Sequence, residues 1–109
     1  MVFRVTEPGK PAFRLRTGED GISVFIPEAV EPALGEDETI ECFRAGSYTV
    51  NVQKSDIERL GLKIVPVTGA ELLPARLRAA HAEIRPGSGM TRRQFKQALR
   101  ELEAHATEE

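Results

Sequence analysis

The sequence predicts a compact α+β domain, with a curved, mostly antiparallel sheet and three or four short helices. Short segments of strand-like alternation fill the first half, whereas helix and strand signals are intermixed in the second half. A chain of 109 residues with 40% hydrophobic residues can bury one core without a disulfide or a metal ion. We therefore expect a single domain over residues 1–106 and a frayed tail over residues 107–109.

The first half predicts three strands. Residues 2–6 alternate weakly and suit an edge strand, which the following Pro- and Gly-containing turn closes. Residues 12–16 place Phe and Leu between arginines, the pattern of a strand with one wet face. Residues 17–21 form a hairpin-like turn into a strand over 22–26.

The middle of the chain predicts a helix over residues 36–44, which Gly46 ends, and then a β-branched strand over residues 47–53. Ser55 and Glu58 have the spacing of a helix-capping box.

Gly61 suits the left-handed residue that ends the helix starting near Ser55. Residues 63–67 follow as a strand, and Pro66 places that strand at an edge of the sheet or marks its end.

The last third predicts a short helix over residues 74–80, a strand over residues 81–86 and a long final helix. Thr91 and Gln94 form a second capping box at the start of that helix. Its apolar residues recur at helical spacing: Phe95, Ala98, Leu99, Leu102 and Ala106.

Cysteine and histidine usage gives no catalytic or metal motif. Cys42 is the single cysteine, and acidic neighbours disfavour its thiolate, so we expect a small core residue. His81 and His105 are far apart, which predicts no metal site. The N-terminus lacks a long apolar run, so we expect no signal peptide, no membrane span and a cytoplasmic location.

Charge is unevenly distributed although the net charge is only −2. Residues 19–41 hold eight acids and no base, and residues 72–100 hold seven bases against Glu83 alone. The two blocks could face each other, or the basic block could bind phosphate, nucleic acid or an acidic partner. Nucleic-acid binding is the least favoured of these, because the chain has one Tyr and no Trp for base stacking.

Several polar residues have both a structural and a functional interpretation. His81 lies where the predicted helix ends and the predicted strand begins, and it can stabilise that junction by hydrogen bonds. Arg4, Arg14 and Arg16 suit a solvated sheet face. Residues 87–89 lie before a helix N-terminus, where free amides can bind an anion or merely connect two elements.

Two motifs carry a family resemblance. Gly21-Ile-Ser-Val-Phe25 is followed by Leu77-Arg-Ala-Ala-His-Ala-Glu-Ile-Arg-Pro86, then by Met90 and an amphipathic helix. This order resembles cytotoxic effectors of type VI secretion that have an ADP-ribosyltransferase-like fold. Phe3-Arg4 also resembles the aromatic–Arg pair that opens the first strand of such folds.

The resemblance implies an ADP-ribosyltransferase-like toxin, or a toxin-related protein, that binds NAD. It implies that Arg4, Arg14 and Ser23 contact the cofactor and that Ser23, His81 and Glu83 form the catalytic set, within one concave site. A carboxylate such as Glu83 would stabilise the cationic ribose of the transfer reaction. An immunity or target protein is the implied partner. The alternative is a non-enzymatic interaction module that uses the acidic and basic blocks.

Overall fold

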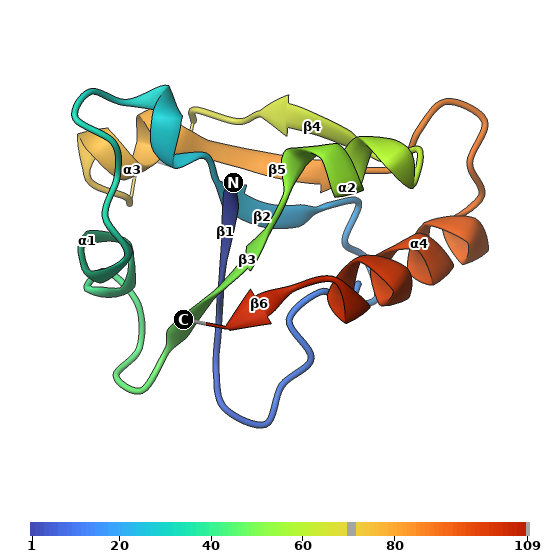
Figure 1. Cartoon of the computed structure of the whole chain (residues 1–109), viewed down its shortest axis with the longest axis horizontal. Helices are drawn as coiled ribbons and strands as arrows, with labels where there is room; N and C mark the ends of the chain where they lie inside the picture. Colours follow the sequence, from blue (N-terminus) through green and yellow to red (C-terminus); the bar gives the residue numbers. More distant parts are fainter. Residues whose placement is uncertain (70–71, 109) are drawn as a thin grey trace.

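A single antiparallel sheet organises the fold in the computed structural model, which describes residues 1–69 and 72–108 (Figure 1). Within this part of the chain the sheet has six strands in the order β4-β5-β2-β1-β3-β6. The strands are β1 (Val2–Thr6), β2 (Ile22–Phe25), β3 (Tyr48–Val52), β4 (Lys63–Pro66), β5 (His81–Arg85) and β6 (Thr107–Glu108). The predicted α+β class with an antiparallel sheet is confirmed.

Successive side chains of a strand point to opposite faces of the sheet. Apolar side chains lie on both faces here, and helices pack against each face. The helical elements are η1 (Pro27–Ala29), α1 (Glu36–Ile40), α2 (Lys54–Arg59), α3 (Ala75–Ala80) and α4 (Arg92–Ala104). One core holds Val2, Val24 and residues of α2 and α4, and we call this side the α4 face. The other core holds Phe3, Phe25 and residues of α3, and we call it the α3 face.

The positions of the strands confirm one edge prediction and correct another. β4 lies at one edge of the sheet, as Pro66 predicted. β1 lies inside the sheet between β2 and β3, so its predicted edge position is wrong. A second partner strand comes from the distant residues 48–52, which local alternation could not reveal.

Residues 12–16 do not form the predicted strand, and the hairpin into β2 is therefore absent. Their alternation did predict burial correctly, because Phe13 and Leu15 are buried whereas Arg14 and Arg16 are exposed. The backbone here is held by side chains instead of a neighbouring strand: the Ala12 amide donates to Glu103 at 2.9 Å. The alternating pattern here thus belongs to a loop segment that packs on α4.

The helix boundaries show which caps form. α4 has the predicted capping box: the Gln94 amide donates to the Thr91 hydroxyl at 3.1 Å, and the Thr91 amide donates to the Gln94 side chain at 2.8 Å. The capping box at Ser55 is wrong, because α2 begins at Lys54 and has no side-chain cap. Gly61 does end α2, with φ of +78°.

The end of α1 and the C-terminal tail also differ from expectation. α1 ends at Ile40, before the predicted residue 44. Thr107 and Glu108, which were expected in the tail, pair with β3 as β6, whereas Glu109 lies outside the described residues. None of the described helices is long and apolar enough to cross a membrane.

Two buried threonines differ in their hydrogen bonding and provide a matched test of the α3 side of the fold. The Thr39 hydroxyl donates to the Gly35 carbonyl at 2.7 Å, whereas the Thr49 hydroxyl has no partner among the described residues. Both side chains are at most 1% exposed. Valine has nearly the shape of threonine, so each substitution replaces only the hydroxyl group with a methyl group.

We predict that Thr39→Val lowers the free energy of unfolding by about 1 kcal/mol, because it removes a satisfied bond and leaves the Gly35 carbonyl without it. Thr49→Val should leave that free energy unchanged or raise it, because burying an unpaired hydroxyl is unfavourable. Urea unfolding of the two variants measures the difference. A loss in Thr49→Val as large as that in Thr39→Val would contradict the prediction.

Candidate functional site

Arg4 is the most deeply placed basic residue of the α4 face. It follows Val2 and precedes Thr6 on the same side of β1, and its backbone lies opposite Val50 of β3. Its Nε donates to the Ala12 carbonyl at 2.8 Å and its Nη1 to the Ser23 carbonyl at 3.0 Å. These two bonds hold the guanidinium in place.

The environment of Arg4 leaves its positive charge without a direct counter-charge. The side chain is half-buried, and no described carboxylate forms an ion pair with it. Burial lowers the pKa of Arg4 below its usual value, and the nearby Glu19 carboxylate acts in the opposite direction. An arginine nevertheless remains protonated in proteins, so Arg4 presents a fixed cation.

The loop from β1 to β2 is fastened to α4 at both ends of the helix. Arg92, at its start, donates to the carbonyls of Arg16 and Glu19, both at 2.8 Å. Glu103, near its end, accepts from the Ala12 amide. The loop consequently lies against the helix and brings its own basic residues beside those of α4.

A cavity of about 750 Å³ lies between this loop, β1 and α4. Six of its lining side chains are basic and come from three separate segments: Arg4 of β1, Lys10, Arg14 and Arg16 of the loop, and Lys96 and Arg100 of α4. Glu7 is the one acidic residue among the described lining residues. We call this hollow the basic cavity, and its lining has a formal charge of +5.

Glu7 is already engaged by one of the six bases. Its carboxylate pairs with the Lys10 ammonium at 2.9 Å. The hydrogen bond from Lys10, with its charge, lowers the pKa of Glu7 below its usual value. Glu7 thus neutralises Lys10, and the five arginine and lysine side chains that remain have no ion-pair partner among the described residues.

The catalytic set implied by the resemblance lies on the other side of the sheet. Ser23 and Glu83 are directly opposed across β2 and β5, and His81 is opposed to Phe25. Phe25 belongs to the core of the α3 face, so Ser23, His81 and Glu83 all project from that face.

Both ionisable members of this set have structural partners. The Nδ1 atom of His81 lies 2.8 Å from the Val67 carbonyl, while the Val67 amide donates to the His81 carbonyl at 3.0 Å. His81 lies at the junction of α3 and β5 and binds the backbone just after β4, so it has a structural role as expected, although the partner at Val67 was not predicted. Glu83 accepts two hydrogen bonds from Arg85 of the same strand, at 2.6 and 3.0 Å.

The expected concave site containing Arg4, Ser23 and His81 is not formed, because the sheet separates Arg4 from the other two side chains. Ser23 contributes only its backbone carbonyl to Arg4. Of the implied cofactor-binding residues, Arg4 and Arg14 do share the basic cavity. The expectation of a solvated sheet face for Arg4 is also wrong, because the loop covers it.

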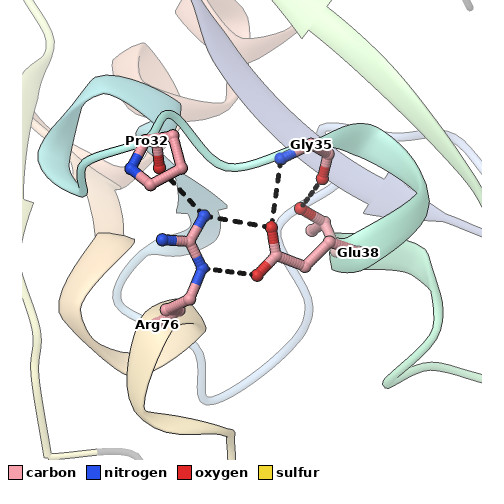
Figure 2. Close-up of polar contacts among 5 residues, drawn as sticks. Pro32, Gly35, Glu38 and Arg76 are labelled. Carbon is pink, nitrogen blue, oxygen red and sulfur yellow. Dashed lines mark hydrogen bonds and ion pairs between the residues drawn. The ribbon is translucent and has the colours of Figure 1, made fainter.

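Elsewhere the acidic and basic blocks partly neutralise each other. Arg76 of α3 binds both carboxylate oxygens of Glu38 in α1, at 2.6 and 3.2 Å, and also donates to the Pro32 carbonyl at 2.9 Å (Figure 2). Glu38 accepts in addition from the Gly35 amide. This contact joins two helices that cover the α3 face, and it supports the interpretation that the blocks face each other.

A second hollow of about 480 Å³ borders residues 87–89 and the end of α2. The backbone of Gly87 packs so closely on Gly61 that an added Cβ would lie 2.0 Å from the Gly61 carbonyl oxygen. The capping box of Thr91 and Gln94 engages the amides of these two residues at the start of α4. Residues 87–89 therefore serve as a tightly packed connector.

Cys42 is exposed, so its expected place in the core is wrong. It follows the end of α1 in a turn, where no strand or helix face covers it. Among the side chains that the structure describes, His, Cys, Asp and Glu form no group of three or more that could hold a metal ion.

Comparison with protein-family models, curated proteins and solved structures finds no match to this chain. The sequence pattern indicated part of the basic cavity, since Lys96 and Arg100 are one helical turn apart on α4. The alternation of Arg14 and Arg16 predicted that these two bases face outward. It carried no information on the bases of α4 that lie on the same cavity.

The Arg76–Glu38 contact predicts a pH-dependent contribution to stability. Hydrogen bonding from Arg76 lowers the pKa of Glu38, with a further lowering by the Gly35 amide. A lowered carboxyl pKa stabilises the fold above the ordinary value of about 4.3 and loses that effect as the pH falls through the lowered value. Glu38→Gln should thus melt at a lower temperature than the wild type near neutral pH.

The difference in melting temperature between wild type and Glu38→Gln should shrink as the pH is lowered from about 5 towards 3, and it should shrink with added salt. Glu36→Gln is the control, because Glu36 lies in the same helix turn without an ion-pair partner among the described residues. Equal pH profiles for the two variants would show that the contact contributes nothing.

Proposed function

We propose that the protein binds a phosphate-bearing anion in the basic cavity. The observation that carries the proposal is the convergence of six basic side chains from β1, the loop and α4 on one hollow of about 750 Å³. That volume lies within the range typical of small-molecule sites, about 300–1,000 Å³. Arginine and lysine are the residues that bind phosphate groups by charge-assisted hydrogen bonds.

Arg4 is the anchor of the proposed site. Bonds to the carbonyls of Ala12 and Ser23 fix its guanidinium, while no described carboxylate balances its charge. A half-buried cation without a counter-ion is unfavourable, and a bound anion removes that cost. The remaining bases lie on exposed parts of the loop and α4, where they can guide and surround the ligand.

The finer proposal is an ADP-ribosyltransferase-like toxin that binds NAD. Its support is that Arg4 and Arg14, the residues implied to contact the cofactor, share the basic cavity and suit a pyrophosphate. Ser23, His81 and Glu83 project from the opposite face, so they would contact no ligand held there. NAD binding and the transfer reaction are therefore separate proposals.

The interaction-module alternative uses the acidic and basic blocks. The basic block contributes Lys96 and Arg100 to the cavity, where an acidic segment of a protein partner would bind in place of the small anion. A short acidic peptide would compete with pyrophosphate for the cavity in that case. Competition by the peptide at lower concentration than pyrophosphate would favour the partner protein.

We predict that pyrophosphate binds to the wild type and that Lys96→Gln and Arg100→Gln each weaken it about fivefold to tenfold. Both residues are exposed, so neither substitution should disturb the fold. Arg93→Gln is the matched control, because Arg93 lies on the same helix outside the cavity lining. Isothermal titration calorimetry at low ionic strength measures the affinities. Absence of binding, or equal loss in Arg93→Gln, would overturn the proposed function.

For NAD, we predict that Arg4→Gln and Arg14→Gln weaken binding, whereas Glu83→Gln leaves it unchanged. The reason is that the first two residues line the basic cavity and Glu83 projects from the α3 face. Arg4→Gln should cost about 1.5–3 kcal/mol, the range for a hydrogen bond to a charged group. Amide chemical shifts during an NAD titration provide the measurement. Weakening by Glu83→Gln alone would place NAD on the opposite face.

A further inference from the structure

We infer that the ligand of the basic cavity carries about three phosphate groups and is recognised through them, without recognition of a nucleobase. This inference rests on the proposed function and specifies its ligand class: a condensed phosphate chain or a small molecule bearing several phosphates. Three features of the cavity lead to it, namely its charge, the spacing of its bases and the chemistry of its walls.

The charge of the lining requires more than one phosphate group. With six bases and Glu7, the formal charge is +5. A phosphate monoester carries a charge of about −1.5 to −2 near neutral pH, so roughly three such groups balance the lining. NAD is a poor match, because each phosphate of its pyrophosphate carries a single negative charge and its nicotinamide ring is positive.

The bases are also distributed around the hollow instead of gathered at one point. Lys96 and Arg100 are four residues apart on α4, which separates their Cα atoms by about 6 Å along the helix axis. Arg4 approaches from the sheet, and Arg14 and Arg16 approach from the loop. A chain or ring of phosphates can contact all three segments at once, and it offers more oxygens to the separate bases than one phosphate group has.

The walls provide little for a nucleobase. None of the described lining residues is aromatic, and the single Tyr of the chain, Tyr48, is not among them. Stacking on an aromatic ring is worth about 1–3 kcal/mol per base, and the cavity cannot supply it. The Glu7 carboxylate, which could accept from an exocyclic amine, is already bonded to Lys10. Affinity therefore comes from the phosphates.

The test is a calorimetric series on the full chain at one low ionic strength, without divalent cations. The probes are orthophosphate, pyrophosphate, tripolyphosphate, inositol hexakisphosphate, ATP and NAD. Affinity should rise about tenfold or more from pyrophosphate to tripolyphosphate, and ATP should bind within about threefold of tripolyphosphate. NAD should bind no more tightly than pyrophosphate. Comparing tripolyphosphate with inositol hexakisphosphate distinguishes a linear chain from a phosphorylated ring.

Variants connect this series to the cavity. Arg100→Gln should reduce the gain between pyrophosphate and tripolyphosphate, whereas Arg93→Gln should retain it, since Arg93 lies outside the lining. Equal affinities for pyrophosphate and tripolyphosphate, or NAD or ATP binding about tenfold more tightly than tripolyphosphate, would overturn this inference and leave anion binding intact. A single-stranded oligonucleotide that binds more tightly than tripolyphosphate would overturn it in the same way. Failure of every anion to bind would overturn the proposed function itself.

Discussion

The attachment of the β1–β2 loop to α4 is the interaction on which the basic cavity depends. Arg92 and Glu103 hold the loop through its backbone, and Phe13 and Leu15 bury their side chains in the core beneath it. A loop held by backbone contacts leaves its own charged side chains available. The fold thereby assembles cations from three segments that would otherwise repel one another.

The two covered faces of one sheet explain why the residues expected to act together are separated. In β1 the side chain of Phe3 enters the core of the α3 face, so its neighbour Arg4 must enter the α4 face. The register of β2 and β5 places Ser23, His81 and Glu83 with Phe25 on the α3 face. A shift of one residue in β1 would move Phe3 to the α4 face and Arg4 into the core of the α3 face, where its charge would be buried among apolar side chains.

The basic residues differ in whether an ion-pair partner within the chain balances their charge. Arg76 binds Glu38, and Arg85 binds Glu83, so these bases are balanced within the chain. The bases of the cavity, Lys10 excepted, have no such partner among the described residues. A net charge of −2 conceals this concentration, because the acids lie mostly elsewhere.

Local patterns in the sequence determined the α+β class, most strands, the cap at Thr91 and the buried face of α4, because each depends on residues close together in the chain. The same patterns predicted that Phe13 and Leu15 are buried. Only the tertiary structure decided that their segment packs on α4 without pairing, that β1 is internal, and that Arg4 and His81 lie on opposite faces. Strand neighbours and register arise from contacts between distant residues, and a single sequence carries no local signal for them.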